Sequence, residues 1–102
     1  MVVRRFNPKR FGPMNISGIP AVKGVYLILD RYNRVQYVGK SNNLLRRLME
    51  HHDDNDIGDA RRFMAYQTKT EGAALKLERK LIRSYCPPYN IRDAASCRRV
   101  EE

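Results

Sequence analysis

One carboxylate lies where the surrounding helical pattern is apolar. Residues 71–85 follow a helical period, and at about 100° per residue Glu78 falls near the middle of the apolar side. That side is formed by Ala74, Leu77, Leu81, Ile82 and Tyr85. An ionised carboxylate in such surroundings is costly unless it meets a cation, a metal ion or a water-filled cleft. The pattern therefore indicates either a functional glutamate or a partly buried glutamate paired with one of the chain's many arginines.

A second group of polar residues lies within two short apolar runs. Gly24-Val25-Tyr26 is followed by Tyr37-Val38-Gly39-Lys40. Gly39 ends a predicted strand and precedes a predicted helix, so a ligand could approach its backbone closely. Lys40 would lie at the start of that helix, where free N–H groups already favour anions. The ordinary alternative is that the tyrosines only pack in strands and that the lysine belongs to a turn.

The helix expected after Lys40 carries two further candidates. Arg47 and His51 are four residues apart, so they share a face beside the leucine stripe of that helix. An acidic segment, residues 53–60, follows and contains Asp53, Asp54, Asp56 and Asp59. A separate metal site could be formed by His51, His52, Asp53, Asp54 and Asp56, but adjacent histidines on a helix point apart. We expect the aspartates to be solvated or to lower the local positive potential.

The strands and helices expected to carry these candidate residues form a small α+β fold. Alternating residues predict strands at 23–30, 34–39 and 61–68, and helical periods predict helices at 43–52 and 71–85. Ser41-Asn42 and Thr70 are the expected N-caps. A turn of even length at residues 30–33 would place Tyr26 and Tyr37 on one face of an antiparallel hairpin, and we expect that arrangement. Residues 1–22 have no clear period and are expected to be irregular.

Charge indicates the kind of partner. The 102 residues include 20 Lys and Arg against 11 Asp and Glu, a formal net charge of +9. A polyanion, most simply a nucleic acid, is the expected partner. No apolar run approaches the roughly 18 residues of a membrane span, and the first residues do not resemble a secretory signal, so a cytoplasmic protein without membrane contact is expected. The bases expected to contact nucleic acid are Arg4, Arg5, Lys9, Arg10, Lys40 and Arg46.

The ordered set of these residues resembles the GIY-YIG nuclease family. The two triplets Gly24-Val25-Tyr26 and Tyr37-Val38-Gly39 match the signature with valine in place of isoleucine. The matching positions that follow are Lys40, Arg47, Glu78 and Asn90. Either triplet alone is weak evidence, whereas the ordered set is specific. The resemblance covers about residues 19–91 and is greatest to the N-terminal nuclease domain of UvrC-type excision-repair enzymes.

The resemblance implies a fold, an activity and a set of roles. The fold is a small three-stranded antiparallel sheet flanked by helices, and the activity is metal-dependent hydrolysis of phosphodiester bonds. Glu78 would bind one divalent metal ion, Mg²⁺ or Mn²⁺. Tyr26 or Tyr37 would be the general base, and the sequence does not choose between them. Lys40 and Arg47 would hold the phosphate, with support from His51, Gly24, Gly39 and Asn90.

These expectations divide the chain into a basic arm (1–18), a nuclease-like domain (19–92) and a polar tail (93–102). DNA is favoured over RNA as the substrate. Specificity could come from the arm, from a dimer or from a targeting partner. The alternative function is that of a non-catalytic basic nucleic-acid-binding module, although a degenerate copy would be expected to have lost Glu78, Arg47 or a tyrosine.

Overall fold

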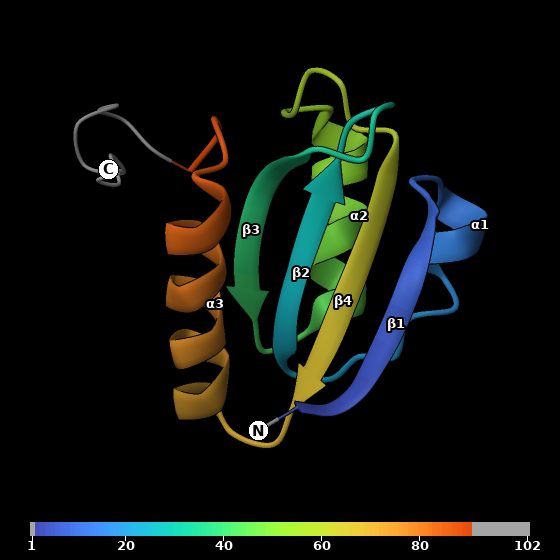
Figure 1. The fold of residues 1–102 in the computed structure, drawn as a ribbon. Coiled ribbons are helices and arrows are strands. Elements are labelled where there is room, and N and C mark those ends of the chain that lie inside the picture. Colours follow the sequence, from blue (N-terminus) through green and yellow to red (C-terminus); the bar gives the residue numbers. More distant parts are fainter. Residues whose placement is uncertain (1, 91–102) are drawn as a thin grey trace, which may run out of the picture.

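A computed structural model describes residues 2–90, in which four antiparallel strands form one sheet in the order β1-β4-β2-β3 (Figure 1). The strands are β1 (Val2–Arg10), β2 (Gly24–Leu29), β3 (Val35–Ser41) and β4 (Arg62–Thr68). The helices are α1 (Pro13–Ile16), α2 (Leu44–Asp54) and α3 (Glu71–Tyr85). The expected α+β class is confirmed. The polar tail expected at 93–102 lies outside the described residues.

The expected number of strands and the expected irregular start of the chain are both wrong. Residues 2–10 form β1, which pairs with β4 at the edge of the sheet. Only Phe6 of this strand is buried, and Phe6 lies opposite Ala65 of β4. Backbone hydrogen bonds to a strand far away in the sequence hold β1, and its polar, proline-containing sequence gives no period that would reveal them.

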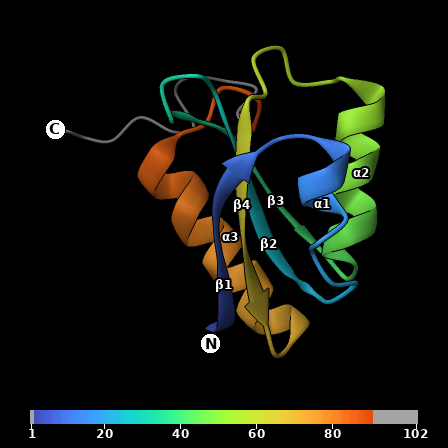
Figure 2. The same cartoon turned by 90° about the vertical axis from the view of Figure 1, so that its right-hand side faces the viewer.

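The sheet separates two apolar cores. Every residue of β2 is buried, because β2 is an inner strand with a helix over each face. Figure 2 shows α1 and α2 on one side of the sheet and α3 on the other. Tyr26 and Ile28 point into the core beneath α2, whereas Val25 and Leu27 point into the core beneath α3. One strand can therefore place a functional side chain beneath α2 while its neighbours anchor α3.

The ends of the helices are set by local hydrogen bonds. Asn43 is the N-cap of α2, one residue beyond the expected Ser41-Asn42, and its side chain accepts a hydrogen bond from the Arg46 backbone at 3.0 Å. Thr70 caps α3 as expected. Helix α2 ends at Asp54, and its C-cap Asn55 adopts a left-handed conformation with φ 51°. Asparagine tolerates this conformation, so the chain turns back directly after the helix.

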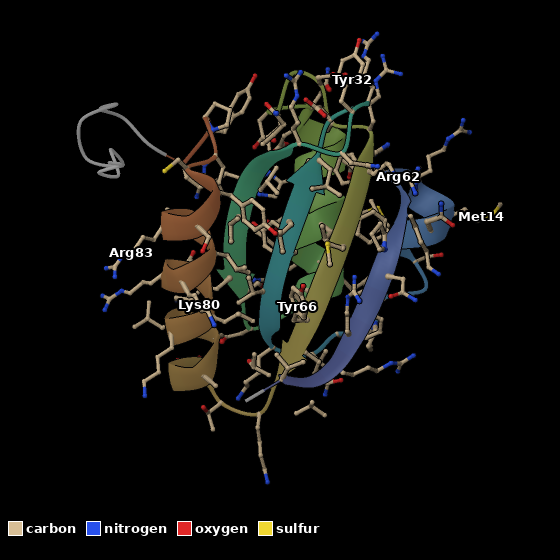
Figure 3. The ribbon with its side chains drawn as sticks, in the orientation of Figure 1. Met14, Tyr32, Arg62, Tyr66, Lys80 and Arg83 are labelled. Carbon is tan, nitrogen blue, oxygen red and sulfur yellow. The ribbon has the colours of Figure 1, made fainter. Side chains whose placement is uncertain are left out.

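The β2–β3 hairpin places the two tyrosines on one face, as expected, but its turn does not have the even length that was expected. The Asp30 N–H donates to the Arg34 carbonyl at 2.9 Å, so residues 31–33 close the turn, with Tyr32 at its exposed end (Figure 3). A turn of three residues would put the tyrosines on opposite faces. An irregularity between the Ile28–Tyr37 and Leu29–Val35 pairs shifts the register and restores the common face.

Asp30 organises this turn from a buried position. Its carboxylate accepts hydrogen bonds from the backbone N–H groups of Tyr32 and Arg34 at 2.8 and 2.9 Å, and from the Arg34 side chain at 2.8 Å. Burial raises the pKa of the Asp30 carboxyl, but these hydrogen bonds outweigh burial and lower the pKa overall. The turn that sets the tyrosine register is thus held by a charged group with its hydrogen-bond partners in place.

No helix within residues 2–90 is long and apolar enough to cross a membrane.

One residue expected on the apolar side of α3 is not buried. Tyr85 is 54% exposed and lies in the last turn of the helix, where it borders an open cavity with Val35 and Gln36 of β3.

Candidate active site

Three rings from three elements meet beneath the sheet. Tyr26 of β2, Tyr37 of β3 and His51 of α2 have ring centroids 5.1 to 6.0 Å apart. Tyr26 and His51 are 1% and 4% exposed, and Tyr37 is half-buried. The structure thus brings together both tyrosines and the histidine that the sequence singled out.

A chain of hydrogen bonds runs through this group. The Tyr26 hydroxyl lies 2.8 Å from His51 Nε2, and the Asp56 carboxylate oxygens lie 2.9 and 3.1 Å from His51 Nδ1. Asp56 is an addition to the site residues expected from the sequence. The left-handed Asn55 directs the chain back toward His51 after α2 ends, and an asparagine after the last helical residue is the signal that could have indicated this.

Tyr26 is held as a neutral phenol. Burial is the largest effect and raises its pKa, and the neighbouring Tyr37 raises the pKa further. The positive charge of Arg47 lowers the pKa of Tyr26 but does not outweigh burial and Tyr37. Nearby cations therefore do not hold Tyr26 as a phenolate in this structure, and its hydroxyl needs a proton acceptor to become a base.

Basic side chains gather at the start of α2. Arg47 Nη1 donates to Glu50 Oε1 at 3.0 Å, and Arg46 Nε lies 3.6 Å from Glu50 Oε2. Both arginines border a cavity of about 290 Å³ between the end of β3 and the first turns of α2 and α3. Its lining residues are Lys40, Ser41, Asn42, Arg46, Arg47, Glu71 and Ala74. The cavity combines positive charge with a helix N-terminus and suits an anion such as phosphate.

Glu78 lies on α3, one turn beyond the cavity residue Ala74. Burial raises the pKa of its carboxyl, and the charges of Lys40 and Arg79 together with the Lys40 backbone offset only part of that effect. Among residues 2–90 no arginine or lysine forms a salt bridge with Glu78. The alternative of a glutamate neutralised by a paired arginine is therefore not what the structure has.

The donor set at Glu78 fits a hard divalent cation. Within the described part of the chain no three His, Cys, Asp or Glu side chains gather to enclose an ion. An ion at Glu78 would therefore have one protein carboxylate, with water and phosphate oxygens as its other ligands, which is common for Mg²⁺. A half-buried carboxylate without a paired arginine would gain most from such an ion.

Two glycines and an asparagine shape the strands around the rings. A Cβ atom at Gly39 would collide with the Tyr26 hydroxyl and ring, and one at Gly24 would collide with the Tyr66 carbonyl oxygen on β4. The Asn90 side chain accepts from Val38 N and donates to Val38 O, each at 2.7 Å. These three residues contact the strands or Tyr26 and have no described contact with Glu78.

The bases near the N-terminus lie away from these rings. They are Arg4, Arg5, Lys9 and Arg10, all exposed on β1. Strand β4 separates β1 from β2, whereas Lys40 and Arg46 border the cavity (Figure 1). The structure therefore divides the expected nucleic-acid contacts into two separate groups.

Comparison with known proteins identifies the family. A family model described as the UvrC-like GIY-YIG domain matches residues 22–91, most of the chain. The chain belongs to the UvrC-like GIY-YIG family. Members of this family are nuclease domains, and the resemblance noted from the triplets, Lys40, Arg47, Glu78 and Asn90 is confirmed at the level of the family.

A curated relative is much longer than this chain. The UvrABC system protein C of Caldicellulosiruptor saccharolyticus is 34% identical over 84 residues. The match takes in 74% of this chain and only 14% of that relative. The chain thus spans a small part of the curated relative's length.

Solved structures confirm the fold. The N-terminal endonuclease domain of UvrC from Thermotoga maritima, as an asparagine-to-alanine mutant bound to its catalytic divalent cation, matches with a TM-score of 0.67 and 26% identity. The match covers 78% of this GIY-YIG domain chain and 93% of that one. A magnesium-bound structure of the same domain has a TM-score of 0.64 at 24% identity, which supports the fold alone.

Proposed function

We propose that this GIY-YIG domain is a metal-dependent endonuclease that hydrolyses phosphodiester bonds in DNA. The observation that carries the proposal is Glu78, a half-buried carboxylate with a raised pKa and no arginine salt bridge among residues 2–90, on the helix that borders a basic cavity. The catalytic divalent cation in the matched UvrC domain supports the same role.

Glu78 is the proposed ligand of one Mg²⁺ or Mn²⁺ ion. When bound, the ion would polarise the phosphate and stabilise the leaving 3′-oxygen. Lys40 and Arg47 would hold the phosphate oxygens and the negative charge that grows in the transition state. Arg46, on the rim of the cavity, would contact the neighbouring phosphate of the strand.

Tyr26 is the proposed general base. Its hydrogen bond to His51 supports this choice over Tyr37, because a buried phenol must pass on its own proton before it can accept one from water. Tyr37 would orient the attacking water or the phosphate. Gly39 and Asn90 would keep β3 and Tyr26 in place.

Substrate choice depends on contacts outside this centre. The exposed bases of β1 would attract the phosphate backbone of DNA without reading its sequence. A dimer or a targeting partner would supply specificity.

Cleavage assays on two nucleic acids test the proposed function. Supercoiled plasmid and a structured RNA are incubated with the protein in Mg²⁺, in Mn²⁺ and with a chelator. We expect metal-dependent conversion of plasmid to nicked circles, with RNA cut more slowly or not at all. Binding of either nucleic acid without any cleavage would favour a non-catalytic binding module instead.

A methyl group at Gly39 is expected to displace Tyr26. The added Cβ would collide with a phenol that is already packed, and overpacking of this kind costs about 1–3 kcal/mol. We expect Gly39→Ala to lower the urea midpoint and to reduce kcat by roughly 10²-fold, as a misplaced catalytic group does. Gly12→Ala is the matched control, because no atom lies within 4 Å of a Cβ there. Equal stability and activity of the two variants would contradict the packing argument.

A further inference from the structure

The hydrogen bonds around His51 determine where its proton lies. An ionised Asp56 can only accept, so the His51 Nδ1 atom must carry the hydrogen in the 2.9 Å contact. A neutral His51 then has a lone pair on Nε2, and the Tyr26 hydroxyl must donate across the 2.8 Å contact. The three residues thus form one directed chain, Tyr26 to His51 to Asp56.

Resting on the proposed nuclease function, we propose that Asp56 is the positioning residue of a Tyr26–His51 proton relay. Tyr26 gives its phenol proton to His51 Nε2 while its oxygen takes a proton from the attacking water. The water oxygen bonds to phosphorus, and the bond from phosphorus to the 3′-oxygen breaks. The electron pair of that bond leaves on the 3′-oxygen, which takes a proton from solvent, and His51 later releases its own proton to solvent.

Burial and charge support a role in proton transfer. His51 is 4% exposed, so the imidazolium formed in this step would be poorly hydrated and needs a negative partner. Asp56 is that partner, and the 42% exposure of its side chain connects the relay to solvent. Burial of Tyr26 raises the pKa of its hydroxyl, which is consistent with the need for an acceptor.

Two other polar residues lie near the His51 ring. Tyr37 of β3 contacts the His51 ring, and Arg47 lies one turn earlier on α2. Arg47 brings a positive charge near this ring, and Asp56 brings a negative one. Neutralising Asp56 should therefore change how kcat depends on pH.

The ring proton of His51 can be observed without any activity. The chain has two histidines, so the variant His52→Gln leaves His51 as the single imidazole. Long-range ¹H–¹⁵N spectra at mildly alkaline pH should show His51 neutral, with the hydrogen on Nδ1. A neutral ring with the hydrogen on Nε2 would overturn the relay, because Nε2 could not then accept from Tyr26.

Kinetics of one variant and its matched control test the function of the relay. Asp56→Asn should lower kcat on plasmid by roughly 10- to 100-fold, part of the 10²–10⁴-fold that a positioned acid–base group contributes. KM should change little, and the kcat–pH profile should differ from that of the unaltered protein. Asp54→Asn makes the same charge change at an exposed position two residues earlier and should stay within about two-fold of the unaltered protein.

The outcomes separate the relay from the proposed function. If the unaltered protein cleaves and Asp56→Asn matches Asp54→Asn in both kcat and pH profile, the relay is wrong and the nuclease assignment stands. If the unaltered protein cleaves nothing, the nuclease assignment fails, and the relay as a catalytic device fails with it. The Nδ1–H form in the spectra, together with the kcat loss and the changed pH profile, would support the relay.

Discussion

Glu78→Gln is expected to abolish metal-dependent cleavage. Glutamine keeps the shape of the side chain but removes the negative charge proposed to hold the cation. We expect kcat on supercoiled plasmid to fall by roughly 10³-fold or more, at least the loss seen when one preorganised charge-stabilising group is removed. Affinity for DNA, measured by fluorescence anisotropy without metal, should stay the same or increase, because the protein loses one negative charge.

Thermal unfolding of the same variant separates a local from a global effect. A carboxyl whose pKa is raised by burial destabilises the folded state at pH 7, because pH 7 lies above the pKa of that carboxyl in the unfolded chain. Glu78→Gln should therefore unfold at the same temperature as the unaltered protein or higher at pH 7. The difference should vanish at a pH where the carboxyl is protonated in both states. Retained Mg²⁺-dependent cleavage would overturn the assignment of Glu78.

Tyr26→Phe has the second largest expected effect. Loss of the hydroxyl removes the proposed base, and kcat should fall by roughly 10²–10⁴-fold, the usual contribution of such a group. His51 Nε2 would also lose its partner in a buried site, which costs about 1–3 kcal/mol and should lower the urea midpoint. Plasmid nicking and urea unfolding measure the two effects separately.

Two other tyrosines serve as comparisons for this variant. Tyr32→Phe changes an exposed hydroxyl at the end of the β2–β3 turn and should leave both rate and stability unchanged. Tyr37→Phe should reduce the rate less than Tyr26→Phe does. If Tyr37→Phe instead removed nearly all activity while Tyr26→Phe kept it, Tyr37 would be the base.

Local patterns predicted the elements that carry the site. Alternation located β2, β3 and β4, the Thr70 cap located the start of α3, and the helical period located its end at Tyr85. These features depend on residues that are close together in the sequence, so local sequence patterns are enough to predict them. The common face of Tyr26 and Tyr37 was also predicted, although the irregularity in β3 that produces it leaves no pattern in the residue types.

Features that depend on distant backbone were missed. Strand β1 exists because β4 offers an open edge, and its exposed polar residues carry no sign of that pairing. Asp56 belongs to an acidic segment in which every aspartate looks alike. Only the direction of the chain after Asn55 distinguishes it, and that direction is a property of one backbone conformation.

The two edges of the sheet are protected against strand addition in different ways. At β3 the outward-facing amide and carbonyl of Val38 are both occupied by the Asn90 side chain, and the Gln36 carbonyl accepts from the Tyr89 backbone at 3.1 Å. At β1 exposed charges, a proline and two breaks in the register make the edge a poor template. Both edges of the sheet are therefore poor templates for a further strand, and Asn90 protects the β3 edge in addition to its proposed support of the active site.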